Sequence, residues 1–400
     1  MTHSQRIRIR RFWRDVRVVI GATLLSTLAS RASAQEARQF FEHTSISGYV
    51  DAYYAYNRNN PVTPCAVVNG VQIFNCLHAF DVDRSSFSIN LAAVGIEKMP
   101  ATGSRVGYRV DLAFGTGAAL IAGEQSDPNV PSQHFLQAYG SFLVSERHPL
   151  QVDVGKFVTP AGFERIDPTE NWNASRSLLF SLAIPRDHTG VRAVFVPNAH
   201  IAVTGLFANG WSDATVNSGG KLAGVSVSAR PGPRVTITQT YLGGSETSID
   251  LDGWRDLSDS VVTGRLTNRL RVAFNADFGR DRRTRQSWQG EALYLQYVVN
   301  DWFAITPRVE SLRDPNGFMT GVAQDLQEAT ATAEFRHAQG FVTRLEYRVD
   351  VADRPFFLKG VSTTVRTQSI ASAECVFFFN SRRPAQPEQA GLLSSLRKKQ

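Results

Sequence analysis

Apolar and polar residues alternate with a period of two along most of the chain. In the segment 341–350, every odd position is apolar or threonine, and from 344 onward every even position is charged: Arg344, Glu346, Arg348 and Asp350. Successive side chains of a β-strand point to opposite faces, so this alternation is typical of strands with one apolar and one polar side. The pattern therefore predicts an all-β protein.

The alternation predicts sixteen strands, separated by segments rich in turn residues. Connections after even-numbered strands are short, such as Thr267-Asn268, and connections after odd-numbered strands are long, such as 158–187. The predicted strands are 45–56, 84–97, 105–114, 133–144, 150–157, 188–196, 200–207, 221–229, 234–243, 259–266, 269–279, 289–299, 302–313, 326–337, 341–352 and 367–379.

Short turns at one end of the strands and long loops at the other, with an even strand count, predict a transmembrane antiparallel β-barrel. A soluble sandwich has no reason to sort its loops by length in this way. A barrel of about sixteen strands encloses a water-filled lumen, so the charged faces are expected to line it and to be solvated. The wall residues predicted to face the lumen are Arg105, Arg109, Asp111, Arg344, Glu346 and Arg348.

The segment 155–193 is the longest stretch that follows neither a strand period nor a helix period. Its apolar residues, among them Trp172 and Phe180, need a place to pack, so we do not expect disorder. Asp167 followed by Pro168 predicts a helix start, with an N-cap and a proline at the first helical position. We expect a long third outer loop, containing a short helix, that folds back into the lumen.

The first 34 residues predict a secretory signal peptide. They contain seven arginines and one aspartate, an apolar run at 18–29, and a small-residue cleavage pattern at Ala32-Ser33-Ala34. The mature chain is expected to start at Gln35, with a short leader, 35–44, before a barrel that occupies 45–380.

The net charge of +7 belongs to the ends of the chain. Between the basic signal peptide and the basic tail, 381–400, the charges of residues 35–380 sum to −3. A basic face for nucleic acid is therefore not indicated. The tail is rich in Pro and Gln before its basic end, and we expect a disordered periplasmic extension. Contact of the tail with an acidic periplasmic polymer is the alternative.

Cysteine and motif spacing predicts one disulfide and no catalytic centre. Cys65 and Cys76 lie in a polar loop and, outside the cytoplasm, are expected to close it with a disulfide bond. Cys375 is expected to be a small apolar residue that faces lipid. The sequence contains no zinc-ligand spacing, P-loop, G-x-S-x-G or H-E-x-x-H motif, so no metal, cofactor or enzymatic activity is predicted.

Four segments carry a resemblance to a known family. They are ISGYVDAYYAYN at 46–57, FDVDRSSFSINLAAVGIEK at 80–98, VGYRVDLAFG at 106–115 and VDVGKFVTPAGFERIDPTENWNASRSLLFSLAIPRDHTGVRA at 152–193. Together they resemble the OmpL-like, "porin-2" type of outer-membrane β-barrel porins. The similarity is strongest over 45–200 and continues more loosely to the last strand.

The resemblance implies passive diffusion of small hydrophilic solutes or ions through the outer membrane of a Gram-negative bacterium. It also implies export through the inner membrane, contact with outer-membrane lipid and lipopolysaccharide, and insertion by the barrel-assembly machinery. Trimers are frequent among sixteen-stranded porins, which leaves a homotrimer open. Such barrels usually end on an aromatic residue of the last strand. Phe379 fits this rule, although residues 380–400 follow it.

In porins of this strand number the third outer loop commonly narrows the lumen, and the resemblance extends this role to 155–193. Opposed acidic and basic groups in a constriction create a transverse field that selects solutes by charge. The alternative is that some of these charges pair and pin the loop to the wall. The predicted constriction residues are Lys156, Glu164, Arg165, Asp167, Glu170 and Arg176.

Two other functions remain open on the sequence. A binding or adhesion barrel with a closed lumen would hold a partner with its long outer loops. An outer-membrane hydrolase would need a Ser/His pair on the outer face. Conductance across a lipid bilayer separates a porin from both.

Overall fold

The computed structural model describes most of residues 44–381. The predicted signal peptide, the leader up to residue 43 and the tail beyond Ser381 lie outside the described residues. The described ranges are 44–62, 65–68, 71–74, 77–80, 85–101, 103–122, 134–145, 147, 149–211, 220–245, 253–337 and 340–381.

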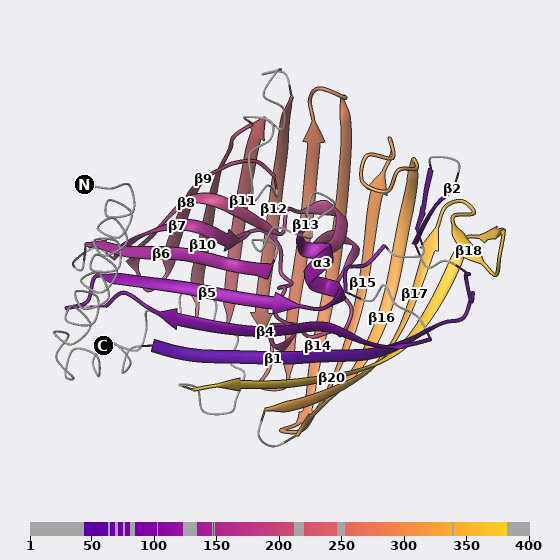
Figure 1. The fold of residues 1–400 in the computed structure, drawn as a ribbon, viewed down its shortest axis with the longest axis horizontal. Coiled ribbons are helices and arrows are strands. Elements are labelled where there is room, and N and C mark those ends of the chain that lie inside the picture. Colours follow the sequence, from indigo (N-terminus) through magenta and orange to yellow (C-terminus); the bar gives the residue numbers. More distant parts are fainter. Residues whose placement is uncertain are drawn as a thin grey trace, which may run out of the picture. The chain divides into compact units, whose positions relative to one another are not determined.

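Sixteen strands close into one barrel (Figure 1). Barrel strands that follow one another along the chain are neighbours in the wall. The first and last strands, β1 and β20, pair antiparallel and complete the circle. The first eight strands are β1 Thr44–Asn57, β4 Phe87–Lys98, β5 Val106–Phe114, β6 Phe135–Ser145, β7 Leu150–Val158, β8 Asp187–Asn198, β9 Ile201–Ala208 and β10 Leu222–Gly232. The other eight are β11 Val235–Ser245, β12 Trp254–Arg265, β13 Leu270–Asp281, β14 Gln286–Asn300, β15 Phe303–Asp314, β16 Gln324–His337, β17 Phe341–Ala352 and β20 Thr367–Asn380.

Each of the sixteen predicted strands corresponds to one strand of this barrel, which confirms the predicted fold class. The predicted start of the strand at 259–266 was wrong, because β12 already begins at Trp254. Its first residues include Asp256 and Ser258 on the outward face, where the alternation would require apolar side chains. The connection predicted as long at 280–288 is a short turn, since β13 continues to Asp281 and β14 begins at Gln286.

Smaller elements within the long connections were not predicted. The connection after β1 contains a hairpin of β2, Cys65–Val68, and β3, Val71–Phe74. The connection after β17 contains a second hairpin of β18, Phe357–Lys359, and β19, Thr363–Val365. A short helix, α3, spans Thr116–Ala122 after β5.

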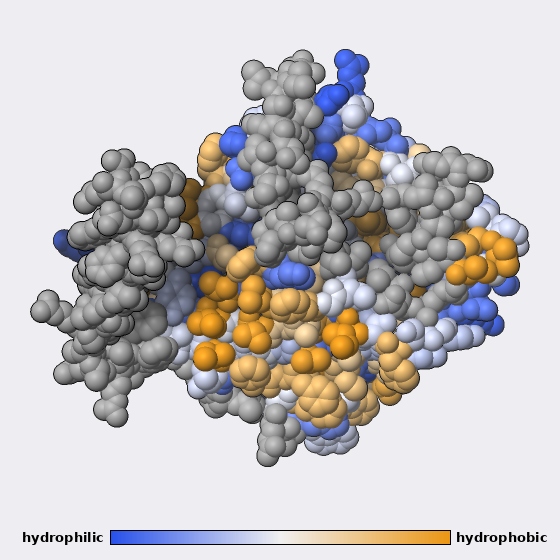
Figure 2. All heavy atoms as spheres, viewed as in Figure 1, coloured by the Kyte–Doolittle hydropathy of each residue, from blue (hydrophilic) through white to orange (hydrophobic). Residues whose placement is uncertain are grey.

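The outward face of the barrel is apolar and the inward face is polar. On β17, the outward side chains of Leu345 and Tyr347 are 54% and 50% exposed, whereas the inward Arg344 and Glu346 are buried. Figure 2 shows apolar residues gathered over the outer face of β4 and β5. Among the described residues, no helix has the length and apolar character needed to cross a lipid bilayer.

Gly155 allows β7 to approach β6 more closely than any other residue would. Its φ of +137° is one that L side chains rarely adopt, and a Cβ at this position would lie 2.1 Å from the Ala138 carbonyl oxygen. We expect Gly155→Ala to destabilise the barrel by about 1–3 kcal/mol, because both the backbone strain and the overlap must be relieved. Urea unfolding of the refolded barrel, followed by heat-modifiable gel mobility, measures this loss.

The matched control is Gly140→Ala on β6, where an added Cβ meets no atom within 4 Å. This variant should unfold like the parent. Equal stability of Gly155→Ala and Gly140→Ala would show that the close approach at Gly155 is not needed.

Candidate functional site

The third long loop consists of residues 159–186, between β7 and β8, the fifth and sixth strands of the barrel. It contains a 3₁₀ helix, Pro168–Glu170, and a five-residue π-helix, Leu179–Ala183. Asp167 caps the 3₁₀ helix by accepting a hydrogen bond from the Thr169 backbone N–H at 2.8 Å. The predicted helix start at Asp167 and Pro168 is therefore confirmed. We call residues 159–186 the third loop below.

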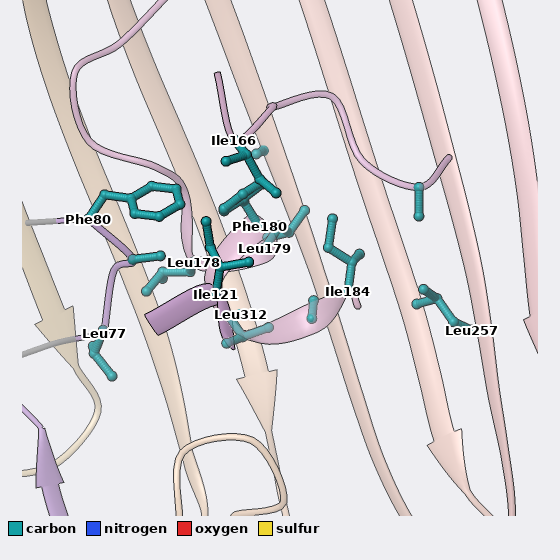
Figure 3. Packing of buried hydrophobic residues seen from close by; sticks show 14 of the residues in the cluster. Leu77, Phe80, Ile121, Ile166, Leu178, Leu179, Phe180, Ile184, Leu257 and Leu312 are labelled. Atoms are coloured by element: carbon teal, nitrogen blue, oxygen red, sulfur yellow. The ribbon is translucent and has the colours of Figure 1, made fainter. Parts of the chain in front are cut away.

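The apolar side chains of the third loop are packed as in a protein core. Leu178, Leu179 and Phe180 are at most 4% exposed and belong to one buried cluster with the wall residues Leu257 and Leu312. Figure 3 shows side chains of the third loop meeting Leu312 and the side chains of Leu77, Phe80 and Ile121, which come from the connections after β1 and β5. The third loop is therefore held by extensive packing as well as by polar contacts.

Arg308 of β15 forms several hydrogen bonds to the third loop. Its guanidinium is fully buried and donates to the Glu164 carboxylate at 2.9 Å and to the Glu328 carboxylate at 2.8 Å. It also donates to the Ser175 carbonyl at 2.9 Å and the Ser175 hydroxyl at 3.0 Å. One wall arginine thus binds two separate parts of the third loop.

Arg344 of β17 holds the 3₁₀ helix. One guanidinium nitrogen donates to the backbone carbonyls of Pro168 and Asn171 at 3.1 and 3.0 Å. The other nitrogens form ion pairs with Glu334 at 2.8 Å and Glu374 at 2.7 Å. Buried carboxylates of neighbouring strands therefore hold the Arg344 guanidinium in place. The guanidinium in turn holds the third loop.

Two wall carboxylates accept hydrogen bonds from backbone N–H groups of the third loop. Glu346 on β17 accepts from the N–H groups of Ala174 and Ser175 at 2.8 and 3.0 Å. Glu310 on β15 accepts from the Leu178 N–H at 2.8 and 2.9 Å. A loop buried against a wall needs such acceptors, because unpaired buried N–H groups are costly.

Further contacts reach β13 and β14. The Asn275 side-chain oxygen accepts from the Phe163 N–H at 2.9 Å, and the Trp288 indole N–H donates to the Ala183 carbonyl at 3.0 Å. In the strand order, β15 lies seven places from β8 in one direction and eight places from β7 in the other. The third loop is thus bonded to inward-facing side chains on the opposite side of the barrel from the strands that carry it.

Part of the connection after β1 is also packed against the third loop. His78 is buried, and its two ring nitrogens lie 2.6 Å from the Arg176 carbonyl oxygen and 3.0 Å from a carboxylate oxygen of Asp350. The Ala79 N–H donates to the Ser181 hydroxyl at 2.8 Å. These contacts were missed by the sequence reasoning, which assigned residues 57–83 no role beyond a disulfide-closed loop.

The predicted constriction residues divide into two sets. In the first set, Arg176 is fully buried and donates to three carbonyl groups of the third loop itself. Glu164 is 4% exposed, and its carboxylate accepts hydrogen bonds from Arg308 and from the Ser177 N–H. Lys156 lies apart from the third loop, on β7, where it pairs with Asp187 at 3.4 Å. The charges of this set are therefore paired or hydrogen-bonded within the protein, and they have a structural role.

The second set, Arg165, Asp167 and Glu170, is half-buried. Arg165 donates to the Gly162 carbonyl at 2.9 Å, and the Asp167 carboxylate accepts from the Thr169 backbone and hydroxyl. Burial raises the pKa of the Asp167 carboxyl, and the hydrogen bonds from Thr169 lower it less. Together with Arg186, which is also half-buried, these are the charged groups of the third loop that are not fully covered.

The predicted wall residues on β5 and just before it differ in exposure. Arg109 donates to Asp111 at 2.8 Å and lies 3.5 Å from Glu97, and the side chains of Arg109 and Glu97 are 35% and 33% exposed. Arg105 precedes β5 and is exposed. It donates to the Val144 carbonyl at 2.6 Å, and its guanidinium lies 5.7 Å from the Phe142 ring centroid.

The predicted wall residues on β17 are not solvated, so this expectation was wrong for that part of the wall. Arg344, Glu346 and Arg348 are 2%, 5% and 2% exposed. Arg348 lies 3.3 Å from Asp350, which in turn contacts His78. The third loop and the segment that carries His78 cover these charges, and pairing makes their burial tolerable.

The predicted disulfide is not described, because Cys76 lies outside the described residues. Cys375 on β20 is half-buried with a free thiol. Within the described ranges, no group of three or more His, Cys, Asp or Glu side chains could hold a metal ion.

A closed sixteen-stranded barrel, with an apolar outer face and a long loop bonded across it, is the fold of an outer-membrane porin. The chain belongs to the family described as "Putative beta-barrel porin-2, OmpL-like", which matches residues 43–379. The predicted family is confirmed, and the family places the chain in the outer membrane. A comparison with curated proteins found no match.

Solved outer-membrane structures share the fold at low sequence identity. The anion-selective porin from Comamonas acidovorans has a TM-score of 0.56 at 9% identity, and the match covers 84% of this chain and 99% of that one. The channel DcaP of Acinetobacter baumannii has a TM-score of 0.53 at 12% identity, covering 84% and 97%. OmpT of Vibrio cholerae, folded in vitro and in its trimer form, has a TM-score of 0.53 at 11% identity, covering 84% and 99%.

Replacing Arg308 tests how strongly the third loop is pinned. Arg308→Met would leave the buried carboxylates of Glu164 and Glu328 without their guanidinium, and we expect a loss of about 3–5 kcal/mol in unfolding free energy. The control, Arg313→Met, lies on the same strand. Its side chain is 65% exposed and 3.8 Å from Asp325, so its loss should stay below about 1 kcal/mol.

Urea unfolding of both variants, with limited proteolysis of the folded barrels, measures the two effects. Cleavage within 159–186 should appear in Arg308→Met and be absent from Arg313→Met. Equal losses in both variants would mean that the buried guanidinium does not hold the third loop.

Proposed function

We propose that this porin is a narrow passive diffusion channel for small hydrophilic solutes or ions, with its passage restricted by the third loop. The observation that carries the proposal is the bonding of residues 159–186 to inward side chains of β13, β15 and β17, on the far wall. A loop that crosses an otherwise wide barrel narrows its open cross-section. Solutes then pass beside the loop.

The charges of the site support a division of roles. The fully buried groups, with Arg308, Arg344 and Arg176 at their centre, brace the third loop. The half-buried groups of its 165–170 stretch remain available to passing solutes, together with the partly exposed Arg109–Glu97 pair. Opposed charges at a narrow point favour solutes of suitable charge and dipole.

No cofactor or catalytic step belongs to this proposal. Transport follows the concentration gradient, and the chain reaches the outer membrane after export with its signal peptide removed. OmpT of Vibrio cholerae has a trimer form, which supports a homotrimeric assembly for this chain as well. Lipid, lipopolysaccharide and the assembly machinery are its other expected partners.

A barrel with a closed lumen is the second candidate, and one observation favours it. The third loop, α3 and the 77–80 segment share one buried cluster, so three separate connections contribute to filling the same space. A binding or adhesion barrel would have this packing and conduct no ions. A hydrolase has no comparable support.

Planar bilayers with the refolded full-length protein distinguish these functions. A porin gives stepwise conductance increases, and the restricted passage proposed here predicts steps smaller than those of porins with an open eyelet. Absence of steps over many insertions of correctly folded protein would exclude the channel and leave the closed-lumen barrel.

Thr169→Cys tests whether the passage runs beside the half-buried stretch of the third loop. Thr169 is half-buried next to Asp167, and the substitution changes little volume. Modification of the new thiol by charged methanethiosulfonate reagents should reduce single-channel conductance, because the added group occupies the passage. Cationic and anionic reagents should shift ion preference in opposite directions.

The parent protein, treated with the same reagents, controls for its own cysteines. A second control, Ser362→Cys, places a thiol in the exposed turn of the β18–β19 hairpin. Unchanged conductance after complete labelling at position 169 would place the passage elsewhere.

A further inference from the structure

A basic surface lies at the long-loop ends of β13, β14 and β15. It consists of five exposed arginines, and we call it the arginine patch: Arg280, Arg282, Arg283, Arg285 and Arg313. Four of the five belong to the end of β13 or to the turn that joins β13 to β14. The braced interior of the barrel makes no use of these arginines, so their position calls for a separate explanation.

The alternation of the strands places the patch on the outward side of the wall. Phe274 and Phe278 of β13 are 38% and 53% exposed on the outward face, and Arg280 is the next residue of that face. Phe278 and Arg313 are both register partners of Gln289 on β14, so they lie at the same level of the wall. The arginines therefore continue the apolar outer face toward the long-loop end.

Two aromatic side chains beside the patch mark the boundary between lipid tails and headgroups. The Tyr241 hydroxyl and the Trp254 indole N–H donate to the Asp256 carboxylate at 2.5 and 2.8 Å. Tyrosine and tryptophan gather at membrane interfaces, where the ring contacts the tails and the polar end contacts the headgroups. Arg282 donates to the same carboxylate at 2.7 Å, and its guanidinium lies 6.0 Å from the Trp254 ring centroid. The arginine patch therefore lies at the level of the headgroups.

The turn between β13 and β14 is held in a defined conformation. The Asp281 carboxylate accepts hydrogen bonds from the Thr284 backbone N–H and from the Thr284 hydroxyl, both at 2.9 Å. Arg285 has a φ of +57°, in the left-handed region that glycine and asparagine adopt with less strain. The turn therefore fixes the positions from which Arg283 and Arg285 extend.

Positive charge exceeds negative charge on this surface. The described residues of β12 to β16 place three outward carboxylates at this end: Asp256, Glu291 and Asp325. Asp256 pairs with Arg282 at 2.7 Å, and Asp325 lies 3.8 Å from Arg313. Five arginines thus share the surface with three carboxylates, and an anionic group can neutralise the excess.

We propose that the arginine patch binds the phosphate groups of lipopolysaccharide in the outer leaflet of the outer membrane. The long loops of such barrels face the outside of the cell, where lipopolysaccharide forms the leaflet. Guanidinium groups bind phosphate through paired hydrogen bonds. The acyl chains of the same molecule lie along Phe274 and Phe278. The proposal rests on the outer-membrane porin proposed above, and it adds the site of a lipid partner.

The test is the affinity of the refolded full-length protein for purified rough-type lipopolysaccharide, measured by titration in detergent. The triple variant Arg280→Gln/Arg283→Gln/Arg285→Asn should bind roughly 10- to 100-fold more weakly, since each arginine at an anionic lipid surface contributes about fivefold. Asparagine tolerates the left-handed conformation at position 285, so the turn should be kept. Arg282 and Arg313 stay in place because each faces a carboxylate.

The matched control is Arg234→Gln/Arg265→Gln/Arg269→Gln, which removes three exposed arginines from the short-turn end. It should bind lipopolysaccharide like the parent. Dephosphorylated lipopolysaccharide should bind the parent and the triple variant equally weakly, because the groups that the guanidiniums recognise are gone. Heat-modifiable gel mobility confirms that each variant is folded.

Three results would overturn the proposal. They are unchanged binding by the triple variant, an equal loss in the short-turn control, and equal affinity of the parent for lipopolysaccharide and for phosphatidylglycerol. The last result would mean that any anionic lipid satisfies the patch.

Planar-bilayer conductance of the same preparations keeps this proposal separate from the channel function. The triple variant should conduct like the parent, because its substitutions lie outside the lumen. Folded parent protein that binds lipopolysaccharide through the patch and forms no channels overturns the channel function alone.

Discussion

The buried guanidinium of Arg308 is the contact on which the arrangement inside this barrel depends. It joins two carboxylates, Glu164 of the third loop and Glu328 of the wall, and two oxygens of Ser175. Charges removed from water destabilise a protein unless each has a close partner of opposite sign. Wall and loop therefore depend on each other: without the third loop, Arg308 would keep Glu328 but lose Glu164 and Ser175, and the buried carboxylate of Glu310 would lose its backbone N–H donor.

This dependence separates the polar groups of the interior by their access to water. Where the third loop covers the wall, Arg344 forms ion pairs and Glu346 accepts backbone hydrogen bonds, so both act as structural contacts. Where it does not, groups such as Arg109 and Glu97 keep about a third of their surface. Under the proposed channel function, the partly exposed charges are the ones that act on a passing solute, because they remain in contact with water.

The strands were predictable because the two environments of a barrel wall impose a period of two. Lipid outside requires apolar side chains, and the interior accepts polar ones. The prediction failed locally where this contrast ends: Asp256 and Ser258 are polar on the outward face, so the first part of β12 was read as loop. The two short hairpins and α3 are too brief to produce a periodic signal.

By itself the sequence determined the sixteen strands, the position of residues 159–186 between the fifth and sixth of them, and the capped turn at Asp167. These features follow from local periodicity and local hydrogen bonding. The partners of the charged residues were decided only by the tertiary structure. Glu164 meets Arg308, 144 positions further along the chain, and Arg176 binds carbonyl groups instead of facing solvent. Closure of the barrel brings these groups together, and no local pattern encodes which strands end up opposite a loop.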